Sequence, residues 1–406
     1  MDIWKTSVEA EEYVIAYRRW LHEHAELSDQ EEETVAFILE QLQDAGIECV
    51  DVPKGGVMGF IYGAKPGKTI LLRADIDALP MQEDTWNAKQ PKVCVSKNDG
   101  VAHTCGHDTH AAMLLASARL LHAYREEFEG RIVLYFERGE EHGNGDYYMT
   151  KYIQDHNIHI DGCWAMHNKV TLPTGKMSIH PGPIYGGSTS WGATILGENA
   201  LACAVAILNN LNIARMRTVT PYEVCTLAGT KIQFGTEKVT TPGACQIGGN
   251  CRYYDMDKAG RPMRDIIYET IKSTCESYGC TTATPLKKGN MSWPCINDAT
   301  CARIAREAVG AIIGQENICI EEPAMGHESF SILASYYPSV MCGLGARNEE
   351  KGMTVGAHNP KHEPDEGCLK IGVAATIAYA LAFLAYDEPI PFDGFRGTAD
   401  EFLHPV

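Results

Sequence analysis

The feature that most constrains the fold is an alternation of short β-rich runs with helical patterns along most of the chain. A helix is expected from Ser7 onward, helical periodicity covers 30–45 and 109–124, and β-rich runs cover 47–52, 57–62, 69–74, 131–137 and 161–167. Strands that alternate with helices are typical of layered α/β folds. We therefore expect an α/β domain with a mostly parallel mixed sheet.

This pattern changes near Pro181-Gly-Pro183 and stays different to about Asn290. The order there is strand, helix (200–213), short strands and helix (261–278), which is typical of a small α+β, ferredoxin-like domain. Helical patterns return at 299–313 and 368–385. The sequence therefore predicts one α/β domain formed by residues 1–183 and 291–406, interrupted by a smaller domain at 184–290.

Composition excludes several classes of protein. Asp and Glu number 53 against 35 Lys and Arg, a formal net charge of −18, which argues against a nucleic-acid partner. The first residues do not resemble a signal peptide, and no apolar run, including 371–386, reaches the ~20 residues of a membrane span. The cysteine count, 15, is odd and the spacing irregular, so we expect reduced thiols in a cytoplasmic protein that binds no membrane.

The densest chemical signal is the segment His103-Thr-Cys-Gly-His-Asp-Thr-His110, at the start of a predicted helix. Helix capping by Asp108 and Thr109 would explain two of its residues, but not a thiol and three imidazoles. Clustered Cys, His and Asp are typical ligands of zinc-like ions. We therefore expect a metal site that includes Cys105 and His107.

Three weaker signals lie elsewhere in the same predicted domain. Glu140-Glu141 follow a strand, where α/β folds place their ligands, although an exposed acidic loop is the simpler interpretation. His167 ends the run 161–167, and a single His at such a place is more often structural than a ligand. His358 lies in a Gly- and Pro-bounded loop before the last helix.

Taken in order, these segments resemble one family, the co-catalytic metal amidohydrolases. Within this family they resemble the branch that holds hippurate hydrolases, bacterial N-acyl-amino-acid amidohydrolases and plant hydrolases of auxin–amino-acid conjugates. The matching motifs are Arg19-Trp-Leu-His-Glu-His-Ala-Glu-Leu27, Leu72-Arg-Ala-Asp-Ile-Asp-Ala-Leu-Pro-Met81, Cys105-Gly-His-Asp108, Glu140-Glu141, His167, Met325-Gly-His-Glu328 and His358-Asn-Pro360.

The resemblance implies a catalytic α/β domain with two divalent metal ions per subunit and an inserted lid or dimerisation domain. The implied metal ligands are Cys105, His107, Glu141, His167 and His358. Zinc or manganese is favoured, and cobalt or nickel also fits such ligands. Glu140 would be the general base, and Asp75, Asp77 and Asp108 would orient the ligating side chains. The family also implies a homodimer.

The inserted domain departs from the family pattern. The family's Gly-Gly-His-Ala-Ala motif, whose His stabilises the oxyanion in a partner subunit's site, is absent after Gly197, and Val239-Thr-Thr-Pro242 replaces its Asn-Val-Ile-Pro motif. Arg252 is kept and could bind a substrate carboxylate, although an exposed strand Arg is the alternative. We expect His327, in the α/β domain, to replace the missing His, with His142 and His180 as weaker candidates and His142 also facing the substrate.

Three functions are therefore weighed. The first is hydrolysis of the amide bond of a small N-acyl amino acid or dipeptide-like molecule by a metal-activated water. The second is metal-dependent hydrolysis of another C–N bond, in an aryl amine or amidine, which would release ammonia. The third is a metal-bound protein that binds a ligand without catalysis; a complete ligand set together with Glu140 argues against it.

Overall fold

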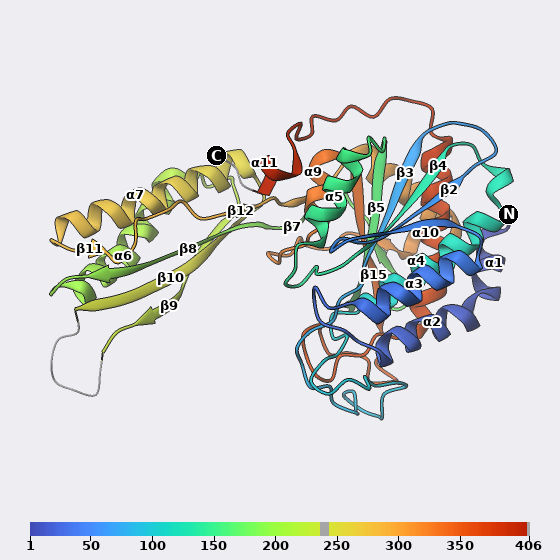
Figure 1. Ribbon diagram of the computed structural model, residues 1–406, viewed down its shortest axis with the longest axis horizontal. Helices are drawn as coiled ribbons and strands as arrows, with labels where there is room; N and C mark the ends of the chain where they lie inside the picture. The colour runs from blue at the N-terminus through green and yellow to red at the C-terminus, as the bar shows by residue number, and fades with distance from the viewer. Residues whose placement is uncertain (236–242, 404–406) are drawn as a thin grey trace. The chain divides into compact units, whose positions relative to one another are not determined.

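The computed structural model describes residues 1–235 and 243–403, and they form two compact units (Figure 1). The first unit comprises Met1–Gly182, Asn297–Glu322 and Ile332–Ala399. The second comprises Pro183–Ile296, Pro323–Ser331 and the C-terminal segment from Asp400. The expected inserted region, 184–290, falls within the longest segment of the second unit. Val239–Pro242, where the family motif is replaced, lies outside the described residues.

The first unit is built on an eight-stranded mixed sheet with the order β1-β2-β4-β3-β5-β15-β6-β14. β3 is parallel to both β4 and β5, β5 is parallel to β15, and β14 is parallel to β6, whereas β1, β2 and the β6–β15 pair add antiparallel ladders. The predicted α/β class is confirmed. The strands are β1 Glu48–Val52, β2 Gly56–Tyr62, β3 Thr69–Asp75, β4 Arg131–Glu137, β5 Gly162–Pro173, β6 Met177–Ser178, β14 Ile318–Cys319 and β15 Ser339–Arg347.

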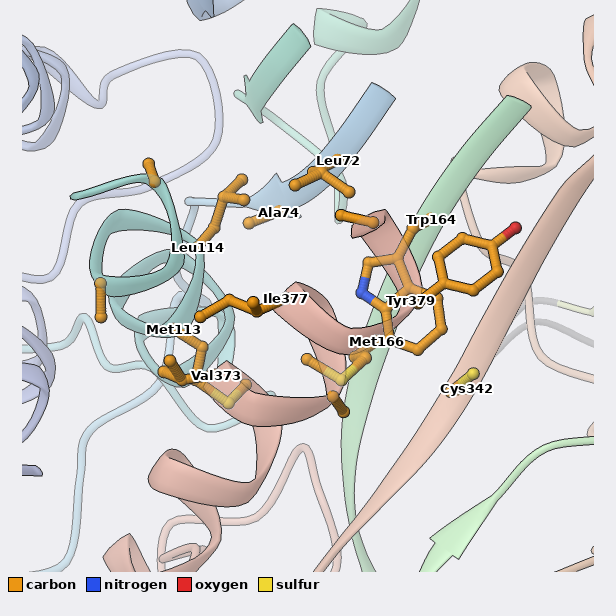
Figure 2. Close-up of a cluster of buried hydrophobic side chains, with 14 of the residues drawn as sticks. Leu72, Ala74, Met113, Leu114, Trp164, Met166, Cys342, Val373, Ile377 and Tyr379 are labelled. Carbon is orange, nitrogen blue, oxygen red and sulfur yellow. The ribbon is translucent and has the colours of Figure 1, made fainter. Parts of the chain in front are cut away.

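The helices of the first unit pack on this sheet or on one another. They are α1 Ile3–Glu9, α2 Glu11–Glu23, α3 Glu32–Asp44, α4 His107–Ala123, α5 Gly145–Asp155, α8 Ala299–Ile313, α9 Ser331–Tyr336 and α10 Leu369–Ala385, with short turns η1 Arg125–Glu127, η3 Gln315–Asn317 and η4 Glu366–Cys368. Figure 2 shows the core between β3, α4, β5 and α10. There the rings of Trp164 and Tyr379 stack with centroids 4.6 Å apart, and the Trp164 indole donates to Thr376 Oγ1 over 3.2 Å. This core fixes the start of α4 relative to β3 and β5.

One helical stretch, Glu366–Ala385, has the length and hydropathy of a membrane span. It is longer than the sequence suggested because the turn η4 extends α10. Within the structure, 72% of its apolar window is buried. Such burial is typical of the core helix of a folded domain.

The second unit has the β-α-β-β-α-β order that the sequence predicted. Its sheet is antiparallel with the order β11-β8-β10-β9, and β12 also pairs with β8. Trp191 and Ile247 on one face of the sheet pack with Ile207 and Ile271 of the helices. The elements are β8 Gly187–Leu196, α6 Ala200–Thr218, β9 Cys225–Gln233, β10 Ala244–Tyr253, η2 Met256–Gly260, α7 Arg261–Ser277, β11 Thr281–Thr282 and β12 Met291–Ser292, flanked by the pair β7 Gly182–Tyr185 and β13 Cys295–Asn297 and by α11 Ala399–Leu403.

Most of the cysteines lie inside the two units. All fifteen lie in the described part of the chain, and none of them forms a disulfide. Twelve are buried, so most act as small apolar side chains.

Candidate metal centre

The loop before α4 and the first residue of that helix carry Cys105 and His107, with Gly106 between them. Gly106 has φ +100°, and a Cβ there would lie 2.4 Å from the side-chain amide of Asn168. Only glycine can therefore occupy this position without displacing Asn168. The Cys-Gly-His spacing is thus fixed by a close approach to β5.

The imidazole of His107 is held by one nitrogen and leaves the other for a ligand. Its Nδ1 lies 3.0 Å from both Oδ1 and the main-chain oxygen of Asp77. Its Nε2 is buried and has no hydrogen-bond partner among the described residues, although Asp75 Oδ2 lies 3.7 Å away and Glu141 Oε1 4.0 Å away. A buried, unpaired nitrogen facing two carboxylates fits a cation between them.

His167 and Cys105 face each other from neighbouring elements. His167 Nδ1 lies 2.8 Å from the main-chain oxygen of Asn168, and its Nε2 lies 3.4 Å from Cys105 Sγ. The sequence placed His167 at the end of its strand, and this is wrong, because β5 continues to Pro173. The continuation follows β15, which pairs His167 with Gly343 and Pro173 with Arg347.

Glu141 and His358 form the solvent-facing side of the cluster. Glu141 Oε1 lies 3.0 Å from His358 Nε2, and the side chain of His358 is 54% exposed. The main chain of His358 has φ +59°, a conformation that is costly for a residue with a side chain and that concentrates at functional sites. Its amide donates to Thr104 O over 2.8 Å, so its loop is tied to the loop that carries Cys105.

These side chains converge into four overlapping groups whose ligand atoms lie within 4.8 Å of one another. The groups are Cys105–His107–His167, Cys105–Glu141–His358, His107–Glu140–Glu141 and Asp75–His107–His110. All five residues expected as ligands are included, and so is Glu140. Thiolate, imidazole and carboxylate together suit zinc and related divalent transition metals. The residues present therefore fit metal ions at this place.

The electrostatics of the cluster also favour a cation. Burial opposes protonation of His107, yet Asp75 and Cys105 raise its pKa well above the usual value. Burial raises the pKa of the Cys105 thiol to about 12. Since the thiolate is the form that binds metal, ionisation of Cys105 requires an additional positive charge beside it.

Several supporting groups were not assigned from the sequence. His110 Nδ1 lies 2.6 Å from Asp75 Oδ1, and its Nε2 lies 2.9 Å from Asn168 Oδ1. Ser28 Oγ donates to Asp77 Oδ2 over 2.6 Å. His110 belongs to the cluster noticed in the sequence, and Asn168 follows His167. Their positions beside predicted ligands could therefore have indicated a supporting role. Ser28 carried none.

Two of the three expected orienting acids approach the cluster directly. Asp75 contacts His110 and Arg73, and Asp77 contacts His107. Asp108 instead forms an ion pair with Arg18 and lies 2.8 Å from His22 Nδ1. Although burial favours the neutral acid, Arg18 and then His22 hold the pKa of Asp108 below its usual range. Asp108 therefore contacts the helix α2 rather than a ligating imidazole.

The remaining candidates lie outside this cluster of side chains or in the other unit. His142 is exposed, and His180 Nδ1 lies 3.2 Å from Pro181 O. The segment Pro323–Ser331, which carries His327, groups with the second unit and not with the α/β unit, since Gly186 N donates to both Ala324 O and Gly326 O. His327 is exposed at the surface, yet the protein atoms packed around it and then the charge of Arg252 lower its pKa.

The chain is similar to several known proteins. Residues 71–382 match the model of peptidase family M20/M25/M40. "Thermostable carboxypeptidase 1" of Saccharolobus solfataricus is 30% identical over 92% of this chain and 96% of its own length. The "N-acyl-L-amino acid amidohydrolase" of Geobacillus stearothermophilus is 33% identical over 66% of this chain and 74% of its own.

A solved structure extends the similarity to the fold. A dinuclear metal-binding peptidase of the M20 family from Bacillus subtilis superposes with a TM-score of 0.78 at 28% identity, covering 93% of this chain and 99% of that one. The resemblance read from the motifs is confirmed. The family model covers well over half of the chain, so the chain belongs to peptidase family M20/M25/M40.

Proposed function

We propose that this protein hydrolyses the amide bond of a small N-acyl amino acid or dipeptide-like molecule with the help of two divalent metal ions. The observation that carries the proposal is the convergence of Cys105, His107, Glu141, His167 and His358, with Glu140 beside His107 and Glu141. Relatives named as amidohydrolases and a dinuclear relative support it.

Residues of the chain have separate roles in the proposed reaction. When bound, two divalent ions lower the pKa of a water molecule and polarise a carbonyl group. Glu140 takes the proton of the attacking water and passes it to the leaving nitrogen. Asp77 holds His107 and Asp75 holds His110, so the groups around the scissile bond keep one orientation. Arg252 binds the carboxylate of the substrate.

The donor set supports a proposal for the metal. A thiolate and imidazoles favour zinc, and the carboxylate of Glu141 also suits manganese, whereas cobalt and nickel accept the same ligands. Elemental analysis of purified protein should give two ions per chain, with zinc or manganese predominant. A single ion at full loading would contradict the proposal.

We assign the missing oxyanion donor to His327. Its lowered pKa favours a neutral imidazole at neutral pH, which can donate one hydrogen bond. Losing one such donor costs about 10²–10³-fold in rate, so His327→Ala should lower kcat on this scale while both metals stay bound. Fully retained activity would exclude His327, and an equal loss in His142→Ala would transfer the role to His142.

The protein is further proposed to be a cytoplasmic homodimer joined through the second unit. In that unit β9 is an edge strand, and Ile213 and Met216 of α6 are exposed. Edges and apolar patches of this kind are usually paired or covered.

The test is a substrate screen with product identification. Purified protein loaded with zinc or manganese is incubated with N-acyl amino acids, dipeptides, aryl amines and amidines, and products are identified by mass spectrometry with an ammonia assay. We expect release of an amino acid, a narrow preference and poor turnover of simple N-acetyl amino acids. Ammonia release alone would support the other C–N hydrolysis, and a broad, fast aminoacylase profile would contradict the assignment of a rebuilt site.

A further inference from the structure

The turn that carries Glu140 and Glu141 is tight and has a glycine at each end. Gly143 N donates to Gly139 O over 2.8 Å, and Gly139 has φ +66°. A Cβ on Gly139 would lie 2.7 Å from the Cα of Gly143. Glycine at both ends permits this close approach, but glycine also leaves the backbone free to adopt other conformations.

Two carboxylates from other parts of the chain hold the backbone of this turn. Asp77 Oδ2 accepts from Glu141 N over 3.0 Å, and Glu31 Oε1 accepts from Gly139 N over 2.8 Å. The two bonds lie on either side of Glu140. Fixing residues 139 and 141 therefore fixes the Cα–Cβ direction of residue 140.

Glu31 is an unusual residue for this place, because it is completely buried. Its Oε2 has no hydrogen-bond partner among the described residues, and the nearest cation, Arg138 Nε, lies 4.0 Å away. Burial, followed by the negative charge of Asp77, raises the pKa of Glu31 to about 7, although the Gly139 amide and Arg138 act in the opposite direction. An incompletely paired buried carboxyl group lowers stability, so its presence calls for a purpose other than stability.

Capping of α3 does not provide that purpose. Glu31 precedes α3, but its side chain makes no cap hydrogen bond to that helix. Glu26 supplies the cap, since its two oxygens accept from Glu33 N over 3.1 Å and from Thr34 N over 2.8 Å. Glu31 instead reaches the turn after β4, where the Arg138 side chain also donates to its main-chain oxygen over 3.2 Å.

We propose that Glu31 is a positioning residue for the reaction, whose side-chain oxygen fixes Gly139 and thereby aims Glu140. This inference rests on the proposed function of Glu140 as the base. Glu31 acts through the backbone of the turn and touches neither substrate nor metal.

The experiment compares Glu31→Ala and Glu31→Gln with the matched control Glu26→Ala. Hydrogen exchange of the peptide covering residues 138–143 reports on the Gly139 amide without any substrate. Glu31→Ala should speed exchange there about tenfold and lower kcat by at least ~10-fold, with KM within about twofold and metal content unchanged. Glu31→Gln should restore most of the slow exchange and most of kcat, because its amide oxygen accepts the same hydrogen bond. Glu26→Ala should speed exchange at the start of α3 alone and leave kcat unchanged.

Three results would overturn the inference. They are unchanged exchange of residues 138–143 in Glu31→Ala, a loss of kcat that only follows a loss of metal, and no restoration by Glu31→Gln. If Glu31→Ala does not fold, Glu31→Asp replaces it, because the shorter side chain cannot reach Gly139. If wild-type protein shows no amidase activity, the proposed function fails, whereas the exchange data still decide whether Glu31 holds the turn.

Discussion

At the scale of single residues, two imidazoles of the centre each use one ring nitrogen for a supporting contact and leave the other for a metal ion. His107 and His167 each bind a neighbouring oxygen through Nδ1 and direct Nε2 toward the cluster. The resemblance could predict the converging residues, because it carries them in recognisable motifs. It could not predict Ser28, since the role of this residue comes from a tertiary contact with Asp77 that leaves no spacing pattern in the sequence.

Glu140 provides the most direct test of the chemistry. Glu140→Gln keeps the size of the side chain but cannot accept a proton at neutral pH. We expect turnover to fall by at least ~10²-fold, the usual scale for loss of a general base, with unchanged metal content and thermal unfolding. Steady-state kinetics, elemental analysis and a thermal unfolding curve measure these three quantities. Near-normal activity would show that another group is the base.

Asp77 can be used to test whether its carboxylate holds the metal ligands in position. Its carboxylate faces His107 Nδ1 with one oxygen and accepts from Glu141 N with the other. In Asp77→Asn one of these oxygens becomes an NH₂ group, so only one of the two bonds can survive. We expect metal affinity to fall about 10–100-fold, measured by competition with a chelator.

Ser28→Ala is the control for Asp77, because it removes a single hydrogen bond to the same carboxylate. Its effect on metal affinity should be clearly smaller. Equal affinities in wild type and Asp77→Asn would mean that the ligands keep their positions without this carboxylate.

At the scale of helices and strands, the sequence predicted the elements whose apolar spacing is regular and missed those that depend on context. The predicted strand 131–137 and helix 299–313 coincide with β4 and α8. The helix α5 was not predicted, since its inward residues are few and no side chain caps its start. The helix expected from Ser7 is in fact two helices, which meet at Ala10. The sequence did not predict the break, because the apolar periodicity continues almost unchanged across it.

The contact between α2 and α4 has an energetic consequence that can be measured. Arg18 Nε lies 2.8 Å from Asp108 Oδ2, and both side chains are buried. Removing one member of a buried ion pair leaves an uncompensated charge and costs about 3–5 kcal/mol. Arg18→Leu should therefore lower the free energy of unfolding by about this amount, measured by urea denaturation of the metal-loaded protein.

The next residue supplies a matched control for Arg18. Arg19 pairs with Glu366 but is 44% exposed, and exposed ion pairs contribute about 0–1 kcal/mol. Arg19→Ala should be correspondingly mild. Similar losses in both variants would show that burial of the Arg18–Asp108 pair is not what ties α2 to α4.

At the scale of the whole molecule, the metal centre belongs to the first unit alone. The grouped ligands all come from the first unit, on both sides of the insertion in sequence, from Cys105 to His358. The sequence segments that form the first unit therefore have to come together before the ligand set is complete. The second unit contributes Arg252 and His327 to the proposed reaction, and it also presents the apolar surface discussed next.

The last prediction concerns assembly through that surface. Leu201, Val205, Ile213 and Met216 expose apolar side chains on α6, with Met216 at 75% exposure, and Ile232 is exposed on the edge strand β9. Apolar residues repeated along a helix next to an unpaired strand edge are typical of a subunit interface. Light scattering should therefore give about twice the monomer mass of 44.6 kDa. Ile213→Glu should shift the protein toward monomer, because a charge in an apolar interface is costly. Ile320→Glu, at a more exposed site on the first unit, should not. A monomer mass for wild type across a wide concentration range would refute the homodimer.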